Sequence, residues 1–189
     1  MKLHRYFPTT IGCYNDPQFT NQVLPIAREF LTTTTKENNN WHYKNTYFDS
    51  DKTQELSDIP LIKEYIFNLA STYIQEIGMN LIRDIDLSCF VSNMEKGDFH
   101  PSHDHPKSLL SGVCYLNTSE QCSGITFYDP RKIKLFTALE KNETNTLDNL
   151  SSINYYPKTG DILIWESWLE HSVEINNCNK RETLVFNLG

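Results

Sequence analysis

The chain reads Ile85-Asp86-Leu87-Ser88-Cys89-Phe90-Val91-Ser92-Asn93-Met94 at the point where its hydrophobic period changes. The side chains at the odd positions are mostly apolar (Ile85, Leu87, Cys89, Val91 and Asn93). They alternate with a mixed set at the even positions (Asp86, Ser88, Phe90, Ser92 and Met94). Because successive side chains of a strand point to opposite faces, this period of two predicts a β-strand. Gly97 ends the run. The strand-rich part of the chain therefore begins with this stretch.

Five more strands are expected downstream, at 109–116, 124–128, 161–165, 172–175 and 182–188. Turn-rich segments such as Asp129-Pro130-Arg131 separate them. Residues 138–152 are polar and are expected to form a long loop. Many short strands with no helix between them predict an antiparallel sandwich or barrel.

Two helices are expected upstream of the strands. Asn15-Asp16-Pro17 provides a helix start, and Pro25 predicts a kink or a late start in the helix that follows. A second helix is expected over residues 59–78, with Asp58 as its N-cap and Gly78 as its end. Its apolar stripe fits packing against a sheet, and it leaves a contact between two copies of the chain open as an alternative.

The length of 189 residues fits a single domain over 1–189. Within it, we expect residues 1–80 to be mainly helical support and residues 81–189 to form the β core. Residues 32–58 are expected to form a loop with at most one short strand. The predicted fold class is therefore an all-β core with flanking helices (α+β).

Charge and hydropathy exclude several classes of protein. The chain has 24 acidic and 17 basic side chains and a net charge of −7, which disfavours nucleic acid as a partner. No apolar run approaches the roughly 18 residues of a membrane-spanning helix, so no membrane span is expected. The first residues lack an apolar export signal, and a cytoplasmic location is the expectation.

The five cysteines do not form a recognisable pattern. Their number is odd and no two are spaced as C-x-x-C. A small disulfide framework or a zinc ribbon would show an even number or close pairs. We therefore expect buried or incidental reduced thiols at Cys13, Cys89, Cys114, Cys122 and Cys178.

Three of the six histidines lie in the segment Phe99-His100-Pro101-Ser102-His103-Asp104-His105-Pro106. On an extended strand His103 and His105 point to the same side, and Asp104 points away. Imidazole is a common ligand for iron, zinc, copper and nickel. A third ligand could come from His171, which opens a predicted strand, although a buried core histidine is an equally simple interpretation of that residue.

Arg181 and Thr183 begin the last predicted strand and share one face of it. A guanidinium group and a hydroxyl group placed in this way can bind one carboxylate together. The alternative for Arg181 is a surface ion pair. The sequence thus combines a candidate metal site with a candidate anion site on a β scaffold.

The order of these motifs resembles the iron(II)/2-oxoglutarate-dependent oxygenases, and more closely a small branch common in bacterial and phage genomes. The resemblance covers nearly the whole chain. It is carried by Asn93-Met94-Glu95-Lys96-Gly97, His103-Asp104-His105-Pro106, Ser111-Gly112-Val113-Cys114-Tyr115-Leu116-Asn117, Asp129-Pro130-Arg131, Ser167-Trp168-Leu169-Glu170-His171, Arg181 and Phe186-Asn187.

The resemblance implies a double-stranded β-helix (a jelly-roll or cupin-like barrel) supported by the N-terminal helices. It implies that Fe(II) is held by His103, His105 and His171. The 2-oxoglutarate cosubstrate would be bound by Arg181, Thr183 and Tyr115, with Asn93 on the cosubstrate side. The implied reaction uses O2 to hydroxylate an unactivated C–H bond and releases succinate and CO2. A small molecule or a peptide or protein side chain would be the substrate.

One position departs from the superfamily pattern. Most members carry a carboxylate where this chain has His105, and Asp104 is out of phase on a regular strand. His100 is also out of phase with His103, so we expect it behind the ligands or near the substrate. Two alternatives therefore stay open. One is a three-histidine, cupin-like metalloenzyme that does not use 2-oxoglutarate, and the other is a non-catalytic binding module.

Overall fold

The computed structural model describes the chain except residues 5, 35–42, 132–143, 145 and 147. Three helices and ten strands are formed by the described residues. The helices are α1 (Pro17–Thr32), α2 (Ser50–Asp58) and α3 (Pro60–Glu76). The strands are β1 (Ile11–Asn15), β2 (Lys44–Asn45), β3 (Leu87–Met94), β4 (His100–His103), β5 (Leu110–Asn117), β6 (Ile125–Tyr128), β7 (Ser152–Tyr155), β8 (Asp161–Glu166), β9 (His171–Val173) and β10 (Arg181–Leu188).

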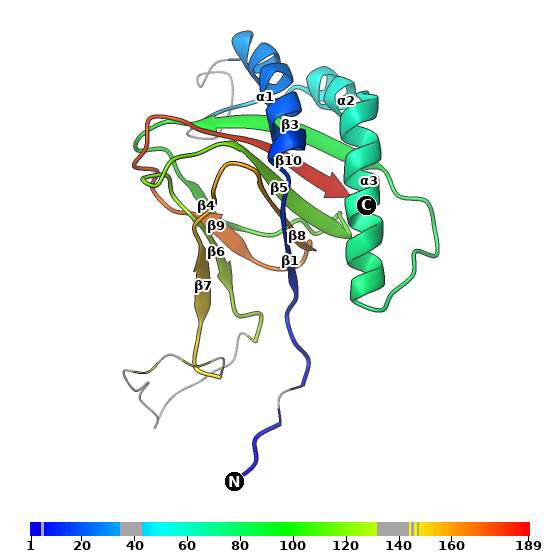
Figure 1. The fold of residues 1–189 in the computed structure, drawn as a ribbon, viewed down its shortest axis with the longest axis vertical. Helices are drawn as coiled ribbons and strands as arrows, with labels where there is room; N and C mark the ends of the chain where they lie inside the picture. Colours follow the sequence, from blue (N-terminus) through cyan, green and yellow to red (C-terminus); the bar gives the residue numbers. More distant parts are fainter. Residues whose placement is uncertain (5, 35–42, 132–143, 145, 147) are drawn as a thin grey trace.

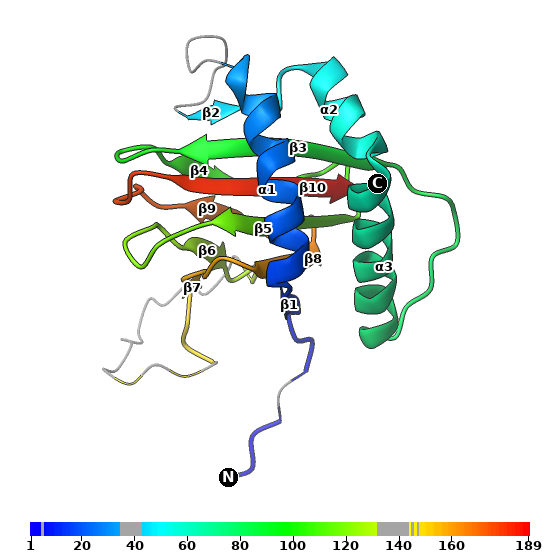
Figure 2. The same cartoon turned by 45° about the horizontal axis from the view of Figure 1, so that its top comes forward.

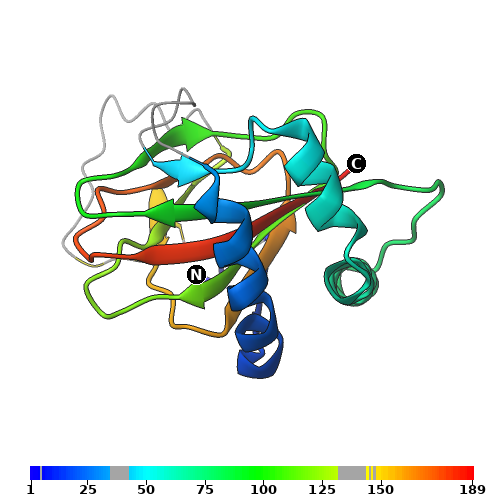
Figure 3. The same cartoon turned by 90° about the horizontal axis from the view of Figure 1, so that it is seen from above.

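Two antiparallel sheets form the β core. The larger sheet has the order β1-β8-β5-β10-β3-β2, and the smaller one has the order β4-β9-β6-β7. Figure 1 shows the smaller sheet on one side of the larger sheet and the helices on the other. In Figures 2 and 3, α1 lies across β3, β10 and β5, and α3 stands beside the ends of these strands. The prediction of a β core flanked by N-terminal helices is confirmed.

The alternation in β3 explains how the layers are held together. Cys89 and Val91 pack in the apolar cluster between the larger sheet and the helices. Phe90, Ser92 and Met94 face the smaller sheet and line a cavity between the sheets. Since both faces of the strand are covered, every residue from Cys89 to Met94 is buried.

Gly112 allows two central strands to pack closely. A Cβ atom at this position would lie 2.0 Å from Cζ of Phe186 and 2.5 Å from the carbonyl oxygen of Leu163. The side chain of Phe186, fully buried on β10, therefore occupies the space above Gly112 on β5. A glycine at this point of the Ser111–Asn117 motif is required by packing.

The first helix begins where the sequence predicts. The carboxylate of Asp16 accepts a hydrogen bond of 2.9 Å from the backbone N–H of Phe19, and Pro17 occupies the first turn. Pro25 lies inside α1, so the late start offered as one possibility is wrong.

The expectation of a loop over residues 32–58 is wrong in part. Residues 50–58 form α2, capped by Asp49, whose carboxylate accepts from the backbone N–H of Lys52. Asp58 ends this helix, and Ile59 precedes α3, so the N-cap predicted at Asp58 is also wrong. A single buried leucine, Leu56, anchors α2, and one apolar residue produces no helical period. The short strand expected in this region is confirmed as β2.

Two edge strands have no counterpart in the sequence-based prediction. Within the described part of the chain, β1 pairs only with β8, and β7 pairs only with β6. Both strands are half-exposed, so their sequences lack a clean apolar alternation. The long loop expected over 138–152 meets β7 only at its last residue, Ser152, and residues 138–143, 145 and 147 of that loop lie outside the described residues.

The expectation that all five cysteines are reduced is wrong. Cys122 and Cys178 form a disulfide, while Cys13, Cys89 and Cys114 are free thiols. The paired cysteines are 56 residues apart and lie in two different connections, so only the tertiary fold brings them together. Among the described residues, no helix is both long and apolar enough to cross a membrane.

A partly buried ion pair attaches α1 to the central strand β10. Arg28 donates to both carboxylate oxygens of Glu182, over 2.9 Å and 2.8 Å, and Asn117 donates to one of them over 2.7 Å. Burial alone would raise the pKa of Glu182, but the hydrogen bonds from Arg28 and Asn117 outweigh this effect and lower the pKa. The carboxylate therefore stabilises the fold in its ionised form.

We expect Arg28→Met to lower the free energy of unfolding at pH 7 by about 1–2 kcal/mol, because the buried Glu182 loses its charged partner while Arg28 itself is half-exposed. The pKa of Glu182 is lowered in the native protein, so this contribution exists above the unfolded-state pKa of 4.5 and is lost as the pH falls through the native one. Urea unfolding at pH 7 and at low pH measures the difference.

Lys63→Met is the matched control. Lys63 pairs with Asp58, and both side chains are at least half-exposed. This substitution should change the free energy of unfolding by less than about 0.5 kcal/mol. Equal losses in the two variants would contradict the role given to Arg28.

Candidate metal centre

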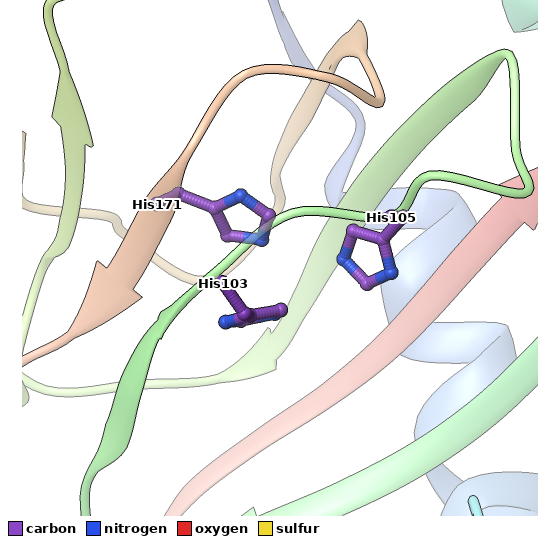
Figure 4. Close-up of side chains that lie close together, drawn as sticks. All are labelled: His103, His105 and His171. Carbon is purple, nitrogen blue, oxygen red and sulfur yellow. The ribbon is translucent and has the colours of Figure 1, made fainter. Parts of the chain in front are cut away.

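Three histidines converge between the two sheets. His103 ends β4, His171 begins β9 and stands opposite it in the strand pairing, and His105 lies in the segment after β4. Figure 4 shows the three rings close together, and the candidate ligand atoms of the three all lie within 4.8 Å of one another. The structure thus brings together the three histidines that the sequence singled out as metal ligands.

His103 and His105 were expected to point the same way because they alternate along one strand. In the structure only His103 lies in a strand, so another feature places His105 beside it. β4 ends at His103, and the chain then turns. The backbone N–H of His105 donates to the carbonyl oxygen of Ser167, over 3.0 Å, which fixes this turn against the segment before His171. Asp104 is exposed and does not belong to the cluster.

A β-bulge turns His100 toward the same cavity. His100 pairs with Val173 and His103 pairs with His171, so three steps along β4 match two steps along β9. The rings of His100 and His103 are stacked, with centroids 4.0 Å apart. A regular strand would place His100 and His103 on opposite faces, as the sequence analysis assumed. The extra residue of the bulge brings both side chains to the same face, so that assumption was wrong.

Backbone carbonyls set the tautomer of two of the histidines. Nδ1 of His103 lies 2.9 Å from the carbonyl oxygen of Pro101, and Nδ1 of His171 lies 2.9 Å from that of Leu169. Because a carbonyl oxygen only accepts, each Nδ1 must carry the proton in these hydrogen bonds. Nε2 of each ring then has a free lone pair, as in histidines that bind metals.

The electrostatic environment keeps these rings neutral. Burial, helped by the neighbouring His103, lowers the pKa of His171 to about 3 and that of His105 to about 4. Burial also lowers the pKa of His103, and that of His100 falls to about 3. Neutral imidazole is the form that binds a metal, so at neutral pH no proton has to be displaced.

Arg181 lies in the wall of the same cavity. Its side chain is only 3% exposed, and its Nε donates to the carbonyl oxygen of Ser123 over 3.2 Å. Its guanidinium carbon lies 5.0 Å from the centre of the Tyr115 ring. Across the described part of the chain, no carboxylate forms an ion pair with Arg181. A buried cation without an anion is a strong site for an anionic ligand.

Thr183 and Tyr115 belong to the same face as Arg181. The hydroxyl groups of Thr183 and Ser92, which face each other across β10 and β3, are 2.8 Å apart. Tyr115 stands opposite Thr183 on β5, and its buried hydroxyl has no hydrogen-bond partner in the described structure. Burial raises the pKa of Tyr115 to about 12, against the opposing effect of Arg181, so its hydroxyl stays protonated.

The structure does not bring Asn93 to this cavity. Ser92 and Met94 line the cavity, and Asn93 between them points to the opposite face of β3. The expectation that Asn93 contacts a cosubstrate is therefore corrected by the pleat of its own strand.

Sequence reasoning missed Tyr43 and Ser92. Tyr43 lies just before β2, lines the cavity, and places its hydroxyl 3.1 Å from Nδ1 of His100. No pattern in its neighbourhood marked it. Ser92 could have been found, because it stands in phase with the other inward-facing residues of β3.

A protein-family model described as "Putative 2OG-Fe(II) oxygenase" matches residues 88–187, more than half of the chain. The match includes the three histidines, Tyr115, Arg181 and Thr183. The sequence matches no curated protein.

Solved structures match over almost the full length of the chain. A prolyl-4-hydroxylase from Pseudomonas putida has 10% identity and a TM-score of 0.64, with 95% of this chain and 92% of that chain covered. The epimerase SnoN from nogalamycin biosynthesis has 14% identity and a TM-score of 0.61, with 95% and 76% covered. HygX from Streptomyces hygroscopicus, solved with nickel, 2-oxoglutarate and hygromycin B, has 11% identity and a TM-score of 0.59, with 96% and 83% covered. At these identities the matches identify the fold, a double-stranded β-helix.

The purified chain is expected to bind one divalent transition metal per molecule. Removing a ligand with His103→Ala or His171→Ala should weaken this binding by more than the roughly 10–100-fold that loss of an outer hydrogen bond costs. His105→Ala should do the same, whereas His105→Asp should retain binding because a carboxylate is also a ligand. Competition with a chelator of known affinity measures each constant.

His4→Ala is the control, because His4 is exposed near the N-terminus and outside the cluster. It should leave the metal affinity unchanged. A loss of affinity in this control comparable to that of His171→Ala would mean that the metal binds elsewhere.

Proposed function

The chain belongs to the 2OG-Fe(II) oxygenase family, and from this premise we propose that it is an Fe(II)- and 2-oxoglutarate-dependent dioxygenase. The proposed reaction hydroxylates an unactivated C–H bond of a substrate and releases succinate and CO2. The substrate class that we propose is a small molecule or a peptide or protein side chain.

A single observation supports this function above the others. The guanidinium group of Arg181 is buried without a carboxylate partner among the described residues, in the wall of the cavity that holds three convergent histidines. A ligand that satisfies both features needs a metal-binding end and a carboxylate at the other end. 2-Oxoglutarate has this form.

The residues fit the two groups that the family implies. His103, His105 and His171 would hold Fe(II), and the hydrogen bonds from Nδ1 of His103 and His171 already orient the rings for it. Arg181 would bind the far carboxylate of 2-oxoglutarate. Thr183 and the unpaired hydroxyl of Tyr115 would donate hydrogen bonds to it.

When bound, iron and 2-oxoglutarate would allow O2 to act as the oxidant, because oxidative decarboxylation of the cosubstrate supplies two of the electrons that O2 takes up. The protein supplies placement. Arg181 would orient the cosubstrate along the cavity, and the apolar side chains of Phe90, Val113 and Val185 in its wall would help to exclude water. Tyr43 and His100 line the cavity as a hydrogen-bonded pair and are candidates for contact with the substrate.

The third histidine favours a second candidate function. A site with His105 in place of a carboxylate carries one negative charge less, as in cupin-like metalloenzymes that do not use 2-oxoglutarate. The buried Arg181 argues against that candidate, since such an enzyme would have no use for a cation that lies in the wall of the same cavity without a carboxylate partner among the described residues.

We expect the chain loaded anaerobically with Fe(II) and 2-oxoglutarate to develop a visible charge-transfer band, and in air to convert 2-oxoglutarate to succinate without added substrate. Arg181→Met keeps most of the side-chain volume and removes the charge. It should weaken 2-oxoglutarate binding by roughly 10–100-fold, the size of a lost charged hydrogen-bonding partner, without changing the metal affinity. Titration of the band and chelator competition measure the two affinities.

Lys107→Met serves as the control for loss of a positive charge, because Lys107 is exposed. Metal binding through the three histidines with no band and no succinate would reject the oxygenase and support the second candidate. Loss of metal and cosubstrate binding together in Arg181→Met would indicate misfolding rather than a lost contact.

A further inference from the structure

A disulfide joins two connections beside the candidate anion site. Cys122 lies in the connection between β5 and β6, and Cys178 lies in the connection between β9 and β10. Both are at most 5% exposed. Nothing in the metal centre or in the fold of either sheet requires a covalent link at this point.

Both connections hold Arg181. Cys178 lies three residues before Arg181 in the chain. Cys122 is followed by Ser123, whose carbonyl oxygen accepts the hydrogen bond from Nε of Arg181 over 3.2 Å. The disulfide thus links the backbone just before Arg181 to the backbone beside Ser123, whose carbonyl group orients the guanidinium group.

Asn176 joins the same connections without a covalent bond. Its Oδ1 accepts from the backbone N–H of Ser123 over 3.1 Å. Its Nδ2 donates to the carbonyl oxygens of Met94 and Cys178, over 3.2 Å and 3.0 Å. Since Asn176 is fully buried, these bonds should persist when the disulfide opens. Opening would then loosen Arg181 locally instead of unfolding the barrel.

We propose that the Cys122–Cys178 pair is a redox-responsive site that sets how firmly Arg181 is held, and through it the affinity for the anionic cosubstrate. This inference rests on the proposed function for the identity of the anion. The oxidised pair holds Arg181 in its binding position, and the reduced pair allows it to move.

The reductant of this site belongs to the class of dithiols. One thiolate of the dithiol attacks a sulfur of the disulfide, and the other cysteine leaves as a thiolate that takes up a proton. The second thiol of the reductant then displaces the remaining cysteine. Two electrons and two protons pass to the pair, and the reductant becomes a disulfide.

The expected effect has a defined size. Loosening one charged hydrogen-bonding partner should raise the dissociation constant of 2-oxoglutarate by about 5–20-fold. Coupling between two sites is reciprocal, so 2-oxoglutarate must favour the oxidised pair by the same factor. A tenfold effect corresponds to a fall of about 30 mV in the reduction potential of the pair at saturating cosubstrate.

The test compares the full chain before and after reduction with dithiothreitol, followed by differential alkylation and mass spectrometry of Cys122 and Cys178. Affinities for Fe(II) and 2-oxoglutarate are measured anaerobically in both states. Weaker 2-oxoglutarate binding at unchanged Fe(II) affinity supports the proposal, and Cys122→Ser and Cys178→Ser should reproduce it singly. Cys13→Ser removes an exposed free thiol on β1 and should have no effect.

A second measurement does not depend on metal or cosubstrate. Phenylglyoxal modifies accessible guanidinium groups, and Arg181 should be protected in the oxidised chain and reactive in the reduced chain, as peptide mapping would show. If Arg181 changes its reactivity but the oxidised chain does not bind 2-oxoglutarate, the proposed function fails and the redox site stands. If the pair is found as free thiols after air oxidation, or if opening it changes neither reactivity nor affinity, the redox site is rejected.

Discussion

The burial of a positive charge in the wall of an apolar barrel constrains the rest of this structure. Transfer of a guanidinium group out of water costs several kcal/mol unless an opposite charge or full hydrogen bonding compensates. Around Arg181 the described chain offers a carbonyl oxygen, an aromatic ring and the sulfur of Met94. These are dipoles and polarisable groups, and none of them carries a charge. The proposed anionic cosubstrate would supply the missing opposite charge, and this is why the arginine is interpreted as part of a binding site and not of a structural ion pair.

The metal centre and the anion site come from different sheets. Arg181 and Thr183 belong to β10 in the larger sheet, while His103 and His171 belong to β4 and β9 in the smaller one. The packing between the sheets therefore determines how far apart the two ends of a ligand can be held. Trp165 of the larger sheet contributes to this packing, because its buried ring forms a T-shaped contact with the ring of His171, with centroids 4.9 Å apart.

The parts of the fold that could be predicted are those in which burial produces a periodic pattern of apolar residues in the sequence. The stretch from residue 85 to residue 94 alternates because helices cover one face and the cavity lies behind the other. The edge strands β1 and β7 are half-exposed and show no such pattern. Helix α2 shows none either, because one leucine anchors it. The convergence of His103 and His171 was predictable from their motifs. The inward turn of His100 was not, because a bulge depends on the pairing of two strands. The position of Asn93 could have been corrected from the sequence alone, since Ser92 and Asn93 cannot share a face.

The balance of charge inside the barrel links these observations. The chain as a whole carries a net charge of −7, yet the cavity places Arg181 and four neutral histidines together, with no carboxylate among the described residues that line it. A divalent metal held by neutral histidines alone would retain its full double charge, whereas one carboxylate ligand would cancel part of it. An anion spanning the candidate site of the proposed function would thus be attracted by a bound metal at one end and by Arg181 at the other, in a low-dielectric cavity where such attractions are strong. The absence of a protein carboxylate at position 105 therefore increases the dependence of the site on its anionic ligand. With a metal bound as proposed, any group that fixes Arg181 would then contribute to the charge balance at the metal as well.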